Sequence, residues 1–287
     1  MFFITGNPRS GTSLLRLLLT AHPHMHVPPE CGFMVWWATK YQHASSFHDE
    51  NLRDQLAEDV TASKKFEFWN LTKEDVQAIA QNEQVSDYAS FCRRLYQMHA
   101  SKAGKPDALL GDKNNFHIGH IPDIDRLQPN GKYIHIVRDG RDVAASYLAL
   151  NAAAKEASSQ YYPKLARTVG QAADEWSQNV MQARSSLAAI PKDRWLEVRY
   201  EDVVRDTVPT LERLCTFLGV KFDPQMLQYH EQNRRHELEP KEFGAWKQRT
   251  FQAIDDSAIG RHKKLGDAAI SAFNDIAGEP LSLYGYL

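Results

Sequence analysis

The hydrophobic positions of the chain form two patterns that alternate along its length. Short apolar runs, which are typical of buried strands, occur at 2–5, 108–113, 132–139 and 194–202. Between them lie longer segments in which apolar residues recur every three or four positions, as on one face of a helix. Strands that alternate with helices in this way predict an α/β fold with a central parallel sheet flanked by helices.

The longer segments predict the helices that connect these strands. Pro23 should end the first of them, and Gly219 a later one. Residues from about 31 to 105 are also helical and amphipathic, and we interpret them as a helical insertion after the first strand and helix. No repeat or linker divides the chain, so we expect a single domain over 1–287. The other helices are expected at 13–22, 121–129, 141–153, 165–187 and 207–219.

Composition and charge exclude several kinds of partner. The chain has 34 Lys or Arg and 36 Asp or Glu residues, so its net charge of −2 creates no overall field that attracts nucleic acid or an anionic membrane. Cys31, Cys92 and Cys215 are far apart and odd in number, which argues against a disulfide framework or a metal knuckle. Because no run of about 18 apolar residues occurs, we expect a soluble cytoplasmic protein, whose oligomeric state stays open.

The stretch GNPRSGTSLL at 6–15 has the form of a phosphate-binding loop. Gly6 and Gly11 lie between a predicted strand and a predicted helix, so backbone N–H groups and the positive helix end can face an anion. Arg9 adds a cation to this loop. The hydroxyl side chains of the loop are Ser10, Thr12 and Ser13.

Two features distinguish this loop from that of a magnesium-dependent NTPase. Thr12 stands where a P-loop NTPase has its lysine. The strand at 132–139 presents Arg138 near its end, where such an enzyme would need an aspartate for the metal. The pattern therefore favours a nucleotide that carries several phosphates and is bound without magnesium.

Two motifs together resemble those of sulfotransferases that use 3′-phosphoadenosine-5′-phosphosulfate (PAPS). GNPRSGTSLL is similar to their 5′-phosphosulfate loop, and YIHIVRDGRDVAASY at 133–147 is similar to their 3′-phosphate motif. RYED at 199–202 and DSAIGRHKK at 256–264 extend the likeness. The resemblance implies one sulfotransferase-like domain with a P-loop-like nucleotide-binding core. It also implies PAPS as donor, 3′-phosphoadenosine-5′-phosphate (PAP) as product, and no metal.

The resemblance also implies which residues bind the cofactor. Arg9 and the loop would hold the 5′-phosphate, and Arg138 with Ser146 the 3′-phosphate. Leu150 replaces an arginine of tyrosylprotein sulfotransferases, so the 3′-phosphate needs another cation. Tyr200 matches a tyrosine near the adenine, and Arg261 a basic residue that closes over the cofactor. The expected cofactor-binding set is Arg9, Ser10, Gly11, Thr12, Ser13, Arg138, Ser146, Tyr200 and Arg261.

An acceptor hydroxyl also needs a general base. In cytosolic sulfotransferases the base is a histidine two residues after a lysine, but here Lys113 is followed by Asn115. In tyrosylprotein sulfotransferases it is a glutamate 21 positions after the loop arginine, which corresponds here to Glu30. We therefore expect Glu30 as base, Lys113 to neutralise the oxygen between phosphate and sulfate, and Arg9 to stabilise the charge that develops on the leaving oxygen.

Two expectations concern the surroundings of Glu30. Neighbouring Trp36 and Trp37 are expected to desolvate its carboxylate and raise its pKa. The simpler reading is that Glu30 caps the helix that begins at CGFMVWW. His24 and His26 remain open as helpers or replacements of the base; we do not expect them to bind a metal.

Alternatives remain for other residues and for the function as a whole. Arg138 could simply pair with Asp139 or Asp142, and Tyr200 could be a packing residue. The acceptor is a hydroxyl of a small molecule, a sugar or a peptide. A P-loop-type kinase acting on a small molecule would instead require magnesium and ATP, and a non-catalytic nucleotide-binding protein would bind PAP without turnover.

Overall fold

The structure is a computed structural model that describes residues 1–44, 47, 49–154 and 162–287. Its centre is a five-stranded sheet in the order β2-β3-β1-β4-β5, and every pair of neighbours is parallel. Ile4 pairs with Lys113 on one side and Ile134 on the other, so the carboxyl ends of the central strands meet at one edge. The strands are β1 (Phe2–Thr5), β2 (Met25–His26), β3 (Leu109–Lys113), β4 (Lys132–Val137) and β5 (Trp195–Arg199).

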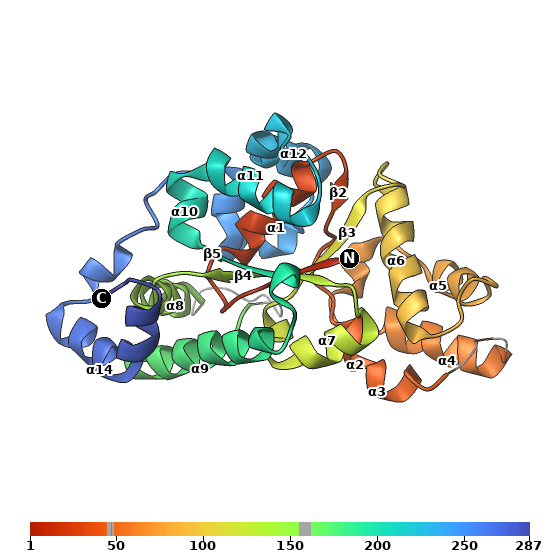
Figure 1. Cartoon of the computed structure of the whole chain (residues 1–287), viewed down its shortest axis with the longest axis horizontal. Coiled ribbons are helices and arrows are strands. Elements are labelled where there is room, and N and C mark those ends of the chain that lie inside the picture. Colours follow the sequence, from red (N-terminus) through yellow and green to blue (C-terminus); the bar gives the residue numbers. More distant parts are fainter. Residues whose placement is uncertain (45–46, 48, 155–161) are drawn as a thin grey trace.

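Helices cover both faces of the sheet (Figure 1). One face carries a layer of α1 (Thr12–Ala21), α10 (Tyr200–Arg205), α11 (Thr207–Leu218) and α12 (Tyr229–His236). The other carries α7 (Ile121–Leu127), α8 (Gly140–Ala154), α9 (Val169–Ala188) and α14 (Asp267–Leu283). One buried apolar cluster packs Phe2, Ile4 and Ile134 against the first layer, and a second includes Phe3 and Tyr133 of the opposite face, which is why β1 and most of β4 are buried on both sides. The helices α8, α9 and α14 share a further cluster.

The described residues of the range 33–102 form a lobe of helices beside the sheet, which we call the helical lobe (Figure 1). Its core is a third apolar cluster that includes Phe33, Trp69 and Tyr96. The lobe contains α2 (Phe33–Trp36), α3 (Ala38–Tyr41), α4 (Glu50–Thr61), η1 (Phe66–Trp69), α5 (Lys73–Ala80) and α6 (Tyr88–Lys102). The remaining short elements are η2 (Asn115–His120), η3 (Lys192–Arg194), η4 (Pro224–Gln228), η5 (Lys241–Phe243), α13 (Gly244–Lys247), η6 (Gln248–Phe251) and η7 (Arg261–Lys264).

The predicted α/β fold and its four strands are confirmed, and the elements differ from the prediction at several places. The two-residue strand β2 was not predicted because it is too short to show a pattern. The run at 194–202 ends as a strand at Arg199, since Glu201 and Asp202 stabilise the first turn of α10. The helix expected at 165–187 begins at Val169, after the side chain of Thr168 caps it.

None of the described helices combines the length and the apolar character needed to cross a bilayer. The aromatic run at the start of the helical lobe is divided between core and surface. Phe33 and Tyr41 are fully buried, whereas 45% of Trp36 is exposed. The run is therefore mainly part of the lobe's core.

Candidate functional site

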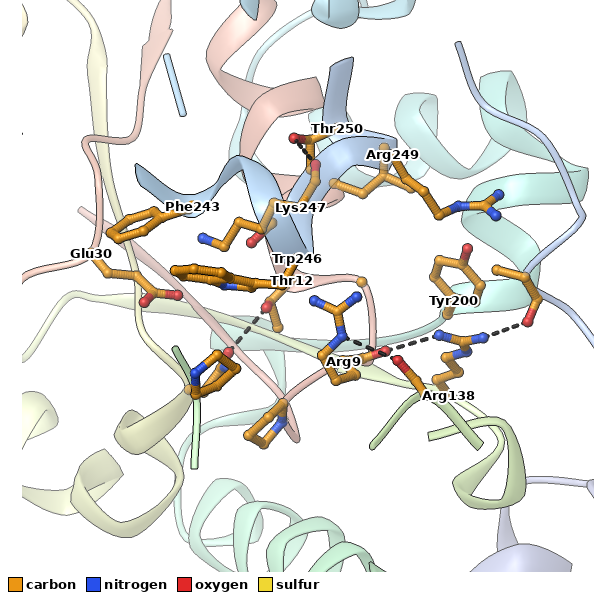
Figure 2. Close-up of a pocket in the computed structure, with 18 of the residues that line it drawn as sticks. Arg9, Thr12, Glu30, Arg138, Tyr200, Phe243, Trp246, Lys247, Arg249 and Thr250 are labelled. Atoms are coloured by element: carbon orange, nitrogen blue, oxygen red, sulfur yellow. Dashed lines mark hydrogen bonds between the residues drawn. The ribbon is translucent and has the colours of Figure 1, made fainter. Parts of the chain in front are cut away.

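A pocket of about 560 Å³ opens where the strands end, which is the usual ligand position in a parallel sheet. Segments that follow β1, β3, β4 and β5 all line it. Figure 2 shows Glu30 at one end and Arg138 with Tyr200 at the other, with Arg9, Thr12 and Trp246 between them. Of the predicted site residues, the lining includes Arg9, Gly11, Thr12, Ser13, Glu30, Arg138, Ser146, Tyr200 and Arg261.

The loop between β1 and α1 has an unusual backbone that its sequence permits. Gly11 has φ 96° and is the N-cap of α1, where no side chain caps the free N–H groups. A Cβ on Gly6 would lie 2.5 Å from the carbonyl oxygen of Ile136, so only glycine fits there. Arg9 itself has φ 70°. The loop thus packs closely against the sheet and leaves the positive end of α1 facing the pocket.

The loop and the 3′-phosphate motif meet directly. Nε of Arg9 donates to Oγ of Ser146 at 3.2 Å, and Nη1 of Arg138 donates to the carbonyl oxygen of Arg9 at 3.0 Å. Nη2 of Arg138 donates to the carbonyl oxygen of Ala258. The Arg138 guanidinium lies 4.6 Å from the Tyr200 ring centre. Two motifs separated by about 130 positions thus form one continuous wall.

The ion pair offered as an alternative for Arg138 is only partly present. Asp139 pairs with Arg141 at 2.8 Å. Asp142 lies 3.8 Å from Arg138, but its oxygens accept from the backbone of Gly260 and from His262 at 2.7 to 2.8 Å. Arg138 is therefore poorly neutralised by these carboxylates.

The electrostatics of this wall suit an anionic ligand. Burial, and then the charge of Arg138, lower the pKa of Arg9 to about 10, because two guanidinium groups share a site with little water. Oγ of Ser10 and Nε of Arg138 are buried and have no hydrogen-bond partner among the described residues. A phosphate in the pocket would supply the negative charge that the two neighbouring guanidinium groups lack. Ser10 itself lies behind the pocket lining.

At the other end of the pocket, Glu30 is held by lysines. Nζ of Lys65 lies 2.5 Å from Oε2, and Nζ of Lys113 contacts Oε1. Burial by itself raises the pKa of Glu30, but the charges of Lys113, Lys247 and Lys65 outweigh burial and hold this pKa well below its usual range. The expectation of a raised pKa was therefore wrong.

The tryptophans expected beside Glu30 have other positions. Trp36 stacks on Phe116, and Trp37 donates to Ser63. Phe243 and Trp246 line the pocket instead. Glu30 is not a helix cap either, because Gly32 is the N-cap of α2 and no side chain bonds to that helix end.

Lys113 lies just behind the pocket wall. Its side chain is 1% exposed and contacts Glu30 and, at 3.3 Å, Oγ of Ser13. Burial lowers the pKa of Lys113 to about 8, although the negative charge of Glu30 opposes this effect. The lysine thus connects the predicted base to the phosphate-binding loop.

Two further cations line the pocket. Arg261 lines the pocket while Nε donates to the carbonyl oxygen of Ser257 at 3.0 Å. Leu150 does not line the pocket, but its carbonyl accepts a bond from Tyr162 at 2.9 Å. Lys164, two residues later, does line the pocket. It is therefore a candidate for the cation that position 150 lacks.

The histidines near Glu30 lie outside the pocket lining. Nε2 of His26 is 2.7 Å from Nδ1 of His99, and the backbone N–H of His24 donates to His22. Neither His24 nor His26 is therefore placed to assist or replace Glu30. Among the described residues, no three His, Cys, Asp or Glu side chains gather as metal ligands do.

Some pocket residues were not predicted from the sequence. They come from the helical lobe and from the segment 241–250, whose mixture of basic and aromatic residues, KEFGAWKQRT, was the available signal. These residues are Lys64, Lys65, Phe243, Trp246, Lys247 and Arg249.

Comparison with known proteins agrees with this geometry. The sequence model of the sulfotransferase family matches residues 2–224. A protein-tyrosine sulfotransferase of Drosophila melanogaster is 26% identical over 231 residues, which are 80% of this chain and 40% of that relative. The chain thus spans less than half the length of this relative.

Solved structures share the fold. The sulfotransferase domain from the curacin biosynthetic pathway has a TM-score of 0.57 at 20% identity and covers 97% of this chain and 96% of its own. A mouse sulfotransferase in complex with PAP has a TM-score of 0.50 at 13% identity and covers 98% of this chain and 83% of its own. Because the family model matches more than half of the chain, this protein belongs to the sulfotransferase family.

Proposed function

We propose that this protein transfers a sulfuryl group from PAPS to the hydroxyl group of an acceptor. One observation carries the proposal: the Arg9 loop and the Arg138 motif meet in the same pocket that contains Glu30. The name of the fly relative and the PAP bound to the mouse sulfotransferase support it. A tyrosine hydroxyl is the first acceptor to test, followed by sugars and small molecules.

The two arginine motifs would hold the two ends of the cofactor. Arg9 and the N–H groups at the start of α1 suit the 5′-phosphate, and Arg138 with Ser146 suits the 3′-phosphate. Tyr200 and Arg261 line the same end of the pocket and would enclose the adenosine. Bound PAPS would supply the sulfuryl group, whose sulfur bonds to the acceptor oxygen as its bond to the 5′-phosphate oxygen breaks.

Glu30 and Lys113 would perform the proton and charge chemistry. Glu30 takes the proton of the acceptor hydroxyl, and its low pKa ensures that it is ionised at neutral pH. Lys113 contacts both Glu30 and Ser13, so it can turn from the carboxylate toward the loop as negative charge develops there. The loss of this counter-charge raises the proton affinity of Glu30 at the step that needs it.

A transfer assay with radiolabelled PAPS and an acceptor library, without magnesium, tests the proposal. We expect label transfer by the parent protein and a loss of at least about 100-fold in Glu30→Gln. PAP affinity should be almost unchanged in that variant, since glutamine has the same shape and Glu30 lies away from Arg138 (Figure 2). Transfer at the parent rate in Glu30→Gln would remove Glu30 from its role; no transfer to any acceptor would count against the function.

A further inference from the structure

The helical lobe contributes a lysine to the predicted base. Oε1 of Glu30 contacts Lys113, which belongs to β3, whereas Oε2 lies 2.5 Å from Nζ of Lys65, which belongs to the lobe. The Glu30 side chain is 11% exposed and that of Lys65 is 24% exposed, so the pair lies at the pocket wall and has limited contact with water. Any catalytic importance of Lys65 therefore rests on the proposed role of Glu30 as the base.

The backbone around Lys65 is tied to the backbone around Glu30 on both sides. Nε1 of Trp69 donates to the carbonyl oxygen of Pro29 at 3.0 Å, and Sγ of Cys31 lies 3.6 Å from the carbonyl oxygen of Lys64. Trp69 is 1% exposed, which fixes this connection in the core of the lobe. The chain thus holds the segments of Lys65 and Glu30 together independently of their ion pair.

Lys65 also has a constrained backbone. Its φ of 72° and ψ of 4° place it in the left-handed region, which a side chain with a Cβ atom adopts only under steric strain. This conformation begins η1 with Phe66 buried beneath the turn. The Lys65 ammonium lies 5.3 Å from the centre of the Phe243 ring, so an aromatic face also restricts it.

The other lysines near Glu30 have additional partners. Lys247, from α13, lies 2.5 Å from Oε1 of Glu239. Lys113 contacts Ser13 of the loop as well as Glu30. The ion pair of Lys65, by contrast, is with Glu30, and its other contact is with the apolar face of Phe243, so its ammonium has no second polar partner among the described residues.

We propose that Lys65 is a positioning residue for sulfuryl transfer: it holds Oε2 of Glu30 while Lys113 turns to the phosphate-binding loop and leaves Oε1 facing the acceptor hydroxyl. The helical lobe thereby completes the catalytic end of a pocket whose cofactor end is built by the sheet. Without Lys65, departure of Lys113 would leave the carboxylate free to rotate. Lys65 acts through Glu30 and needs no contact with the donor.

An NMR titration of the Glu30 carboxyl carbon, in protein with ¹³C-labelled glutamate and no ligand, tests this proposal directly. Glu30→Gln identifies the resonance. Removing a cation in direct contact should raise the titration midpoint in Lys65→Met by about one pH unit. Lys65→Arg should restore most of the shift, because arginine can re-form the ion pair with the same backbone strain.

Lys64→Met is the matched control. It removes the same charge from the neighbouring, exposed residue that lines the same pocket, so water should screen its effect to less than about half of that of Lys65→Met. Equal midpoints in the parent and in Lys65→Met would overturn the proposal, as would equal shifts in Lys64→Met and Lys65→Met. Because this titration requires no acceptor, it is separate from the transfer assay, whose failure would instead overturn the proposed function.

Once an acceptor is known, kinetics provide a second readout. In Lys65→Met we expect kcat to fall by about tenfold with a changed pH profile, while the KM for PAPS stays nearly constant. A variant that raised the KM for PAPS at constant kcat would show that Lys65 binds the donor, which contradicts a positioning role.

Discussion

Arg138 has two tasks that a lysine cannot both perform. Its planar guanidinium bonds to the carbonyl oxygens of Arg9 and Ala258 and also lies over the Tyr200 ring. Its Nε is buried and has no hydrogen-bond partner among the described residues. A lysine would keep the charge but would lose this fork of donors.

We therefore expect Arg138→Lys to weaken PAP binding by at least about tenfold, because a charge-assisted hydrogen bond contributes about 1.5–3 kcal/mol. Binding of adenosine 5′-phosphate, which lacks the 3′-phosphate, should fall by less than about threefold. Calorimetric titration of both nucleotides measures the difference. Arg126→Lys is the control for the substitution itself, since its side chain is 62% exposed and pairs with Asp123 outside the pocket. Equal losses for the two nucleotides would refute the 3′-phosphate assignment.

For single residues, the sequence predicts which of them belong to the binding motifs, but it does not predict the pKa values that their charged neighbours produce. Arg9, Arg138, Ser146 and Glu30 were expected in one site, and the pocket contains all four. The pKa of Glu30 was mispredicted because its lysine partners lie 35 and 83 positions away in the chain. No local pattern marks Lys65, which has its position only because the helical lobe packs against the segment of Glu30.

The join between β1 and α1 is the element on which the cofactor end depends. Gly11 has φ 96°, and a Cβ there would lie 2.5 Å from Cδ2 of Tyr200. Gly219, the C-cap of α11, has a similar φ of 86° but nothing within 4 Å of its Cβ position. An alanine would therefore suffer similar backbone strain at either position, but the two sites differ in the space available for its Cβ atom.

We expect both Gly11→Ala and Gly219→Ala to lower the free energy of unfolding by about 1 kcal/mol or more through this strain. Only Gly11→Ala must also displace the Tyr200 ring, so it should be the less stable variant and should bind PAP at least about tenfold more weakly. Urea unfolding and calorimetric titration measure the two effects. If Gly11→Ala binds PAP as tightly as Gly219→Ala does, the packing of Gly11 against Tyr200 has no part in the site.

The elements that carry strong periodic patterns were predictable, and those defined by tertiary contact were not. The strands at 2–5 and 132–139 are buried on both faces and appear as continuous apolar runs. β2 consists of two residues that pair with β3, so it exists only within the sheet. The short turns η5, α13 and η6 place Phe243 and Lys247 at the pocket, yet each is too short for a helical period to show.

Across the whole molecule, charge is balanced overall and concentrated locally. The net charge is −2, but the described pocket lining contains eight lysines and arginines against Glu30 and Asp255. These cations come from segments between residues 9 and 261, which the fold brings together at one edge of the sheet. The fold thus supplies the local cluster of cations that binding of a polyanionic ligand requires.

A buried histidine pair links the stability of the whole molecule to pH. Nε2 of His26 lies 2.7 Å from Nδ1 of His99. Burial, and then the charge of His99, lower the pKa of His26 to about 2, and burial lowers that of His99 to about 4. Both pKa values are depressed in the folded state, so the stabilisation is complete above about pH 6.5, the unfolded pKa of histidine, and decreases as pH falls below it.

Between about pH 7.5 and 5.5 these two histidines become protonated in the unfolded chain but stay neutral in the folded protein. The free energy of unfolding should therefore fall by about 1 kcal/mol for each of them. His99→Gln keeps a hydrogen-bonding side chain beside His26 but removes one titrating group, and it should reduce this loss by roughly half. His43→Gln, which replaces an exposed histidine, is the control for the substitution itself. Urea unfolding at the two pH values measures all three proteins, and the same pH dependence in His99→Gln as in the parent would mean that acid destabilises the fold elsewhere.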